Sequence, residues 1–313
     1  VATTSTRLDT DTLAIQARFE SEFWSGELQG LDPISNNVEW SATDELPSAS
    51  ARNIITWNSD GLGTQVDFDT SMPGTMKTRI ASSTNGQPID DVINFLRGDR
   101  SNEASGFRRR NVDTVLGDII NSRPVLAGAS NEGWSRLSGT PGDEYPGYVD
   151  GDKSTRTPVV YVGGNDGMLH GFDASTSSSG GTEVMAYAPG AVLDDIGSLA
   201  NPTYRHRFFV DGQMTVGDYY DGGWKTALVG GLGAGGKGIY ALNIKDPSNP
   251  EVLWEITSDD DPDIGYTFGK PLIHRVGGKW VAIFGNGYGS ANGQAHMYVV
   301  DLLNGNVLNK IAL

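Results

Sequence analysis

Asp259, Asp261 and Asp263 lie at alternate positions of the segment DDDPD and form a D-x-D-x-D run. Such a run opens many calcium loops, because Ca²⁺ takes about six to eight oxygen ligands. The rest of the loop pattern departs from this: Ile264 stands in the place of the loop glycine and Lys270 in that of the closing glutamate. The three aspartates are therefore candidate calcium ligands, and the pattern favours the alternative, a solvated acidic loop between strands.

A second short pattern is the tripeptide Arg97-Gly98-Asp99. On an exposed turn such a tripeptide can engage an integrin, with the aspartate completing a metal site on the receptor. Gly98 also follows the last apolar residue of a predicted helix, where glycine is a common C-cap because it adopts positive φ. We expect the structural role first and treat the three residues as candidate integrin-binding residues.

The glycine-rich segment 231–238 (GLGAGGKG) fits G-x-G-x-x-G and nearly fits the P-loop pattern. Both patterns need a helix behind the loop, because the N–H groups of the helix N-terminus face the phosphates. Here residues 239–244 alternate like a strand, and Gly238 replaces the hydroxyl residue that would hold Mg²⁺. The segment is therefore predicted to be a hairpin turn.

Catalytic groups are hard to assemble from this sequence. His170, His206, His274 and His296 are isolated, and neither G-x-S-x-G nor H-E-x-x-H occurs. A triad built from distant residues stays an open alternative. We expect packed or surface histidines, no enzyme and no organic cofactor.

Composition excludes several function classes. The 313 residues include 23 basic and 39 acidic side chains, a net charge of −16, and no cysteine, so disulfides and thiolate metal sites are excluded. Nucleic acid binding needs a basic stripe. The one candidate, residues 108–110 (RRR) with Arg97 and Arg100, is expected to pair with local carboxylates. No apolar run approaches the roughly 18 residues of a membrane span, so we expect neither nucleic acid nor a membrane span.

Among the elements that must position these residues, only one predicted helix stands out, at residues 88–96. Its apolar residues recur three and four apart (Ile89, Val92, Ile93 and Leu96), and two aspartates near its start favour the positive end of the helix dipole. Everything else is typical of β-strand and turn.

The strands repeat as a unit: a strand, a glycine turn, a strand closed by aspartate or asparagine, a loop and a third strand. The three copies cover residues 157–163, 169–173 and 183–187; 225–230, 239–243 and 251–256; and 279–285, 297–301 and 307–312. Residues 28–32 and 38–40 form a partial copy, and residues 123–128 indicate one more first strand.

The spacing of these units favours a β-propeller. Matching glycines at positions 128, 163, 230 and 285 are 35, 67 and 55 residues apart. Irregular spacing of one supersecondary unit indicates a propeller with loop insertions rather than a tight solenoid. The alternative is a β-sandwich with coincidental similarity. We predict an all-β propeller domain over residues 1–313, with one short helix.

Longer motifs make the chain similar to a known family. They are residues 94–103 (NFLRGDRSNE), 107–110 (FRRR), 116–126 (LGDIINSRPVL), 159–173 (VVYVGGNDGMLHGFD) and 265–271 (GYTFGKP). In this order they resemble the C-terminal domain of the PilY/PilC family, the type IV pilus tip-associated adhesin and assembly proteins of Gram-negative bacteria. The similarity covers most of the chain.

The resemblance implies a seven-bladed propeller of the quinoprotein type, exported to the pilus tip or cell surface, with a periplasmic or outer-membrane-associated pool. It implies minor pilins as partners, and roles in pilus extension and retraction, twitching motility and adhesion to host or abiotic surfaces, with calcium as regulator. The sequence supports four or five blades, and the family's calcium loop would follow Leu313. We therefore expect part of the family's domain, binding calcium weakly or not at all.

Two alternatives stay open. A quinoprotein dehydrogenase, using pyrroloquinoline quinone and calcium, has the same blade architecture, and a purely structural propeller would only assemble other proteins. Neither vicinal cysteines nor an axial cluster of cofactor-binding side chains can be identified. The sequence therefore favours a non-catalytic scaffold whose loops supply the contacts.

Overall fold

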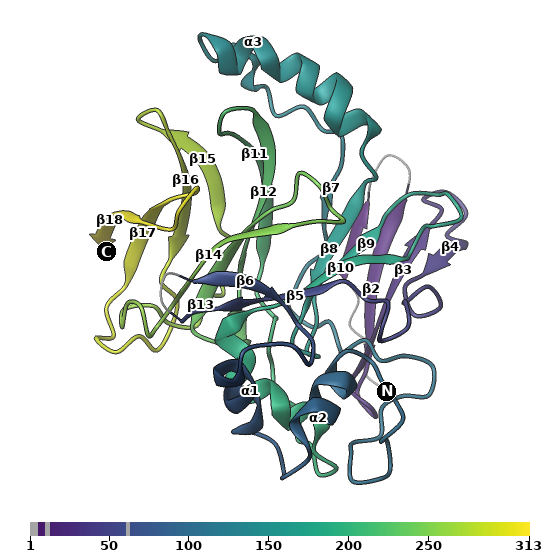
Figure 1. Cartoon of the computed structure of the whole chain (residues 1–313). Coiled ribbons are helices and arrows are strands. Elements are labelled where there is room, and N and C mark those ends of the chain that lie inside the picture. The colour runs from purple at the N-terminus through teal and green to yellow at the C-terminus, as the bar shows by residue number, and fades with distance from the viewer. Residues whose placement is uncertain (1–5, 10–12, 61–62) are drawn as a thin grey trace.

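The computed structural model of the chain describes residues 6–9, 13–60 and 63–313, with side chains from residue 13 onward. Four sheets follow one another along the chain (Figure 1). Three have four antiparallel strands, and the second is extended to six. We name these sheets blades 1 to 4 in chain order.

The strands have the following bounds. Blade 1 contains β1 (Thr6–Asp9), β2 (Ala14–Glu20), β3 (Ser25–Leu31) and β4 (Val38–Ser41). Blade 2 contains β7 (Val125–Ala127), β8 (Val159–Gly163), β9 (Leu169–Asp173) and β10 (Glu183–Ala188), extended by β5 (Ile54–Asn58) and β6 (Thr64–Asp67). Blade 3 contains β11 (Met214–Tyr220), β12 (Trp224–Gly231), β13 (Gly238–Asn243) and β14 (Glu251–Thr257). Blade 4 contains β15 (Leu272–Val276), β16 (Lys279–Gly285), β17 (His296–Asp301) and β18 (Val307–Ala312).

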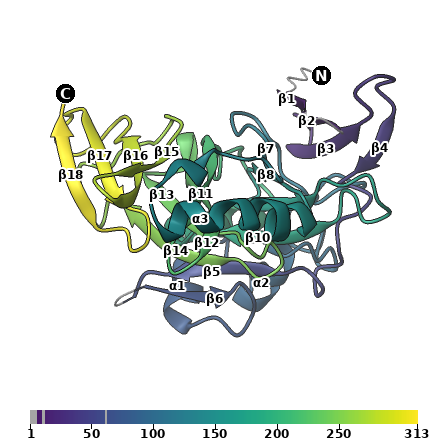
Figure 2. The ribbon, with the colours of Figure 1, turned by 90° about the horizontal axis from the view of Figure 1, so that it is seen from above.

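The blades are arranged as in a β-propeller. The first strand of blade 3, β11, contacts the first strands of its two neighbours, β7 and β15. Figure 2 shows the sheets side by side, from blade 4 at one end to blade 1 at the other. The predicted fold class is therefore confirmed, with four blades in the described part of the chain.

The three predicted repeat units are confirmed as the second, third and fourth strands of blades 2, 3 and 4. The partial copy corresponds to β3 and β4 of blade 1. Each blade also has a first strand, and the sequence indicates this strand only for blade 2. Polar residues inside these strands, Asp218 in β11 and Arg275 in β15, interrupt the apolar pattern. Residues 123–128 do not begin another blade; they contain β7, which pairs with β8 and completes blade 2.

Local side-chain chemistry ends the third strand of every blade. There the side-chain oxygen of an aspartate or asparagine accepts a hydrogen bond from the backbone N–H two residues further on, at distances of 2.8–3.1 Å. The accepting residues are Asp32, Asp173, Asn243 and Asp301. This is the turn that such residues form most readily. A bulge then interrupts the pairing of third and fourth strands in all four blades.

The predicted helix is confirmed as α2 (Ile89–Leu96), but the expectation of a single helix is wrong. The chain also forms α1 (Gly74–Ala81), α3 (Thr140–Gly147) and α4 (Leu193–Ile196). Helix α1 buries only Met76 and Ile80, and α3 contains Pro146, so neither has a strong helical period. Further helical turns are η1 (Trp134–Arg136), η2 (Tyr148–Lys153), η3 (Gly190–Val192), η4 (Gly197–Ala200) and η5 (Gly233–Gly235).

Two insertions interrupt the succession of blade strands. Between blades 1 and 2, residues 42–124 carry α1, α2 and the β5–β6 hairpin, and β5 pairs in parallel with β10. Between β7 and β8, α3 and η2 pack on blade 3, where Lys153 Nζ lies 2.7 Å from buried Asp218 Oδ2. The Tyr145 and Trp224 rings, 4.4 Å apart, reinforce this contact. In the described part of the chain, no helix has the length and apolar character needed to cross a membrane.

Candidate functional site

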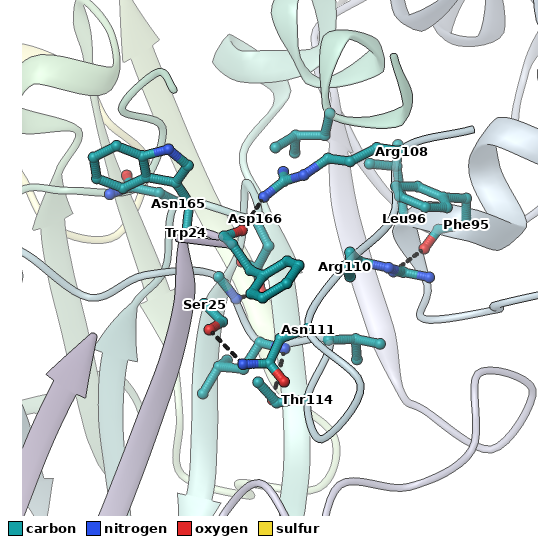
Figure 3. A pocket seen from close by; sticks show the side chains of 15 residues that line it. Trp24, Ser25, Phe95, Leu96, Arg108, Arg110, Asn111, Thr114, Asn165 and Asp166 are labelled. Carbon is teal, nitrogen blue, oxygen red and sulfur yellow. Dashed lines mark hydrogen bonds between the residues drawn. The ribbon is translucent and has the colours of Figure 1, made fainter. Parts of the chain in front are cut away.

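Segments far apart in the sequence meet at a small cavity between blades 1 and 2 (Figure 3). The β2–β3 turn contributes Trp24 and Ser25, the insertion contributes Arg108 and Arg110, and the β8–β9 turn contributes Asp166. The cavity volume is about 30 Å³, roughly the space of one water molecule. We call it the junction cavity.

Four of the five motifs that resemble the known family line this cavity. Their contributions are Phe95 and Leu96; Arg108 and Arg110; Leu116 and Gly117; and Asn165 and Asp166. Gly117 allows the closest approach, since a Cβ there would lie 2.2 Å from the backbone nitrogen of Asp166. The Gly117 N–H donates to Asp166 Oδ2 at 2.8 Å. The motif residues thus build a tight joint between segments.

Arg110 holds the insertion together beside the cavity. Its guanidinium donates to Glu103 Oε1 and to the carbonyl oxygen of Phe95, both at 2.7 Å, and to the carbonyl oxygen of Asp99. It also lies 3.8 Å from the centre of the Phe95 ring. Burial lowers the pKa of Arg110 to about 10, partly offset by Glu103, so the side chain stays cationic at neutral pH.

Arg108 joins the insertion to blade 1. Its guanidinium donates to the carbonyl oxygen of Phe23 and lies 4.0 Å from the centre of the Tyr204 ring. Burial lowers the pKa of Arg108. Arg109, between these two arginines, is exposed. Alternation along the chain thus directs two arginines inward and one outward.

A buried charge network continues from Asp166 into blade 2. His170 lies between two carboxylates, with Nδ1 2.7 Å from Glu183 Oε1 and Nε2 3.0 Å from Asp166 Oδ1. Arg52 binds the same Glu183 with two N–H groups, at 2.6 and 2.8 Å. Burial alone would lower the pKa of His170, but Asp166 and Glu183 raise it to about 9. The imidazole is therefore a cation at neutral pH.

A second network joins the β8–β9 turn to the segment before blade 3. Asp118 Oδ2 accepts the Asn165 side-chain amide at 2.7 Å and lies 2.8 Å from His206 Nε2. The His206 ring lies 3.8 Å from the Trp24 ring. The partners of Asp118 are 47 and 88 residues away in sequence, and Arg52 is 131 residues from Glu183. No local motif signals such contacts, and sequence analysis missed them.

The histidines have the packed or surface positions that we expect. His170 and His206 bind carboxylates, His274 lies near the Trp134 ring, and His296 lies near the Tyr298 ring. Within the described residues, none of the four histidine rings is hydrogen-bonded to a serine side chain.

All three residues of the Arg97-Gly98-Asp99 tripeptide make hydrogen bonds within the protein. Arg97 donates to the carbonyl oxygens of Phe68, Ala49 and Arg52 at 2.7–2.9 Å. Gly98 has φ +112° and its N–H donates to the carbonyl oxygen of Phe95, as a C-cap does. Asp99 accepts the Ser101 N–H at 2.6 Å. The arginine side chain is thus engaged inside the protein, and integrin binding by this tripeptide stays a prediction.

The structure brings together two of the three candidate calcium ligands. Lys310 Nζ lies 2.9 Å from Asp261 Oδ2 and 2.7 Å from Asp263 Oδ2, whereas Asp259 is exposed and outside this cluster. Hydrogen bonds from Lys310 lower the pKa of Asp263 and overcome the effect of burial on Asp261. Within the described residues no three acidic or histidine side chains form a metal cage. Lys310 is paired with both carboxylates, and weak or absent calcium binding stays a prediction.

The expectation for the glycine-rich segment is confirmed. Residues 231–238 connect the antiparallel strands β12 and β13 through the turn η5, so the segment is a hairpin turn.

The expectation for the basic cluster is confirmed only in part. Arg100 and Arg110 both pair with Glu103. Arg97 and Arg108 donate to backbone carbonyl oxygens instead.

Residues 116–313 match the family model of the PilY1 beta-propeller domain. The chain belongs to this family. The PilY1 family model thus begins at the junction cavity, at Leu116, and covers the strands from β7 to β18.

Curated PilY1 relatives agree with this assignment. A type IV pilus biogenesis factor PilY1 homolog of Xylella fastidiosa is 45% identical over 237 residues, covering 71% of this chain and 16% of the relative. The type IV pilus biogenesis factor PilY1 of Pseudomonas aeruginosa strain PAK is 44% identical over 237 residues, covering 74% of this chain and 19% of the relative. The chain thus spans less than a fifth of the length of these two PilY1 proteins.

Among solved structures, the crystal structure of the Pseudomonas aeruginosa PilY1 C-terminal domain is similar to this chain, with 36% sequence identity and a TM-score of 0.49. The match covers 60% of this chain and 37% of that domain.

Proposed function

We propose that this chain is the propeller portion of a type IV pilus biogenesis factor and acts without catalysis at the pilus tip. There it binds minor pilins and supports pilus extension and retraction, twitching motility and adhesion to host or abiotic surfaces. The observation that carries the proposal is the family match over residues 116–313, together with relatives named as pilus biogenesis factors. The protein that contains this chain is exported, with a periplasmic or outer-membrane-associated pool.

The junction cavity supports a scaffold role. Its volume of about 30 Å³ is far below the roughly 300–1,000 Å³ of small-molecule sites. Its arginines bind backbone carbonyls of neighbouring segments rather than facing an open cleft. These residues hold blade 1, the insertion and blade 2 in fixed relation, so that the surrounding loops present a constant surface to partners.

The dehydrogenase alternative is not favoured, because the relatives are named as biogenesis factors rather than enzymes. Incubation of the chain with pyrroloquinoline quinone, calcium and a panel of alcohols and sugars separates the two functions. We expect no turnover above background; turnover that disappears without the quinone would establish the enzyme.

Pull-down of minor pilins tests the proposal directly. The immobilised chain should retain minor pilins from detergent extracts of piliated cells, and a heat-denatured sample of the same chain should not. In cells that lack the full-length factor, reintroducing it should restore surface pili and twitching. The proposal fails if no minor pilin is retained and the reintroduced factor restores neither property. Retention without restored motility would favour the purely structural scaffold.

A further inference from the structure

The outer edge of blade 3 lacks a partner that blade 2 has. In blade 2 the fourth strand, β10, is followed by β5, which pairs with it in parallel through Ile54, Ile55 and Thr56. The equivalent strand of blade 3, β14, pairs only with β13 among the described strands. This fold therefore already adds a strand to a blade edge once.

A groove of about 430 Å³ runs beside β14. Its lining includes Trp57 and Ser59 from the β5–β6 hairpin, Asn304 from the β17–β18 turn and Asp260 from the acidic loop. Figures 1 and 2 both place β14 beside this hairpin. The volume lies within the roughly 300–1,000 Å³ of ligand pockets.

At the first residues of β14, a side chain makes the hydrogen bonds that a neighbouring strand would make. Gln65 of β6 accepts the Val252 N–H with Oε1 at 2.7 Å and donates from Nε2 to the carbonyl oxygen of Pro250 at 3.2 Å. A primary amide offers the same donor and acceptor as a peptide group. The edge of β14 thus accepts peptide-like hydrogen bonds at one end through a side chain.

Further along β14, backbone groups point into the groove. The Ser258 N–H donates to the carbonyl oxygen of Lys237, next to β13, whereas the Thr257 N–H points the other way, to Asp260 Oδ2. Since backbone groups alternate in direction along a strand, the N–H and C=O of Glu255 face away from β13. An added strand would satisfy them.

The acidic side chain of the groove without an ion pair is Asp260. The other acidic lining residues are Glu255 and Asp261, and no lysine or arginine lines the groove in the described part of the chain. The Glu255 carboxyl accepts the Tyr187 hydroxyl and the Gly190 N–H, and burial raises its pKa to about 7. Asp261 is paired with Lys310, whereas Asp260 has no ion pair with any described residue. The negative charge of Asp260 would therefore attract a binding segment that carries a lysine or arginine at this position.

We propose that the free edge of β14 binds an extended segment of a partner protein as an added strand, with a lysine or arginine of that segment beside Asp260. Backbone hydrogen bonds supply the affinity, and the cationic residue sets the preference, as in other cases of strand addition. The inference goes beyond the proposed pilus function and does not depend on it.

Peptide binding tests this inference. The probe is a fluorescent, acetylated and amidated peptide, TVKVKVT, titrated with the chain and followed by anisotropy. We expect saturable binding below about 1 mM, and at least about tenfold weaker binding when alternate peptide nitrogens are methylated or both lysines become glutamates. No saturation, or equal binding of the methylated peptide, overturns the proposal.

Protein variants locate the site. Asp260→Asn keeps an acceptor for Thr257 and should weaken the lysine peptide, whereas the neighbouring Asp259→Asn is the matched control and should not. Ser59→Trp should fill the groove and abolish binding. Equal binding by all variants would overturn the assignment to β14. Binding by this chain but not by the full-length protein would place the occupant in the same polypeptide and overturn the partner assignment.

Discussion

Lys310 Nζ lies 2.9 Å from both carboxylate oxygens of Asp261. Lys310 is in β18, the last strand of blade 4, and Asp261 is in the loop that leads from blade 3 to blade 4. The Tyr298 hydroxyl donates to the same carboxylate at 2.7 Å. The acidic loop thus anchors the outer edge of blade 4, and the lysine supplies the positive charge that a metal ion would otherwise bring.

We predict that calcium does not stabilise this chain. Lys310 already pairs with Asp261 and Asp263, and calcium would have to displace it. Ligand at about 100 times Kd stabilises a protein by roughly 2.7 kcal/mol, so at about 1 mM calcium a site of roughly 10 μM affinity would raise Tm visibly. Thermal unfolding in calcium and in magnesium should coincide. A calcium-specific rise that Asp261→Ala removes would establish a site in this loop.

We predict that Asp99→Glu leaves adhesion of integrin-bearing cells unchanged. The substitution keeps the charge but displaces the carboxylate by about one methylene, which an integrin should not tolerate. Because Arg97 is bound to three backbone carbonyls, we expect the tripeptide to have a structural role rather than to act as a ligand. Asp113→Glu, at an exposed aspartate nearby, is the control. Loss of adhesion in Asp99→Glu alone would contradict the structural interpretation.

We predict that stability falls as the pH rises from about 6.5 to 9. His170 has a folded-state pKa of about 9, against 6.5 for an ordinary histidine, because Asp166 and Glu183 favour its cation. The contribution, on the order of a few kcal/mol, is complete below pH 6.5 and disappears as the pH passes 9. Denaturant unfolding across this range measures it. His170→Gln should flatten the profile; an equally steep profile in the variant would assign the effect to another group.

We predict that Arg110→Ala lowers the free energy of unfolding by about 2–3 kcal/mol, because it removes charged hydrogen bonds from a buried site. Arg109→Ala should change it by less than about 0.5 kcal/mol, as expected for an exposed residue. The two positions are adjacent and identical in type, so the pair isolates the effect of the inward contacts. Chemical denaturation measures both, and equal effects would contradict the joint described for Arg110.

The repeat of the blades could be predicted from the sequence because its signals are local. Alternating apolar residues, glycine turns and an aspartate or asparagine after the third strand act within a few residues of one another. This is why Asp173 and Asn243 were assigned to turns correctly. The first strands β11 and β15 could not be predicted because polar residues interrupt their apolar pattern. Such a residue is buried only because another element supplies its partner, as Lys153 does for Asp218.

The contacts at the junction cavity and the acidic loop required the tertiary structure. His170 meets Glu183 only because β9 and β10 pair in one register, and Arg52 reaches the same carboxylate from 131 residues away. Lys310 meets Asp261 across 49 residues for a similar reason. Residue types show which charges exist, whereas strand register and blade packing decide which of them become neighbours. A D-x-D-x-D run or an Arg-Gly-Asp string therefore has no fixed chemistry until the fold supplies its partners.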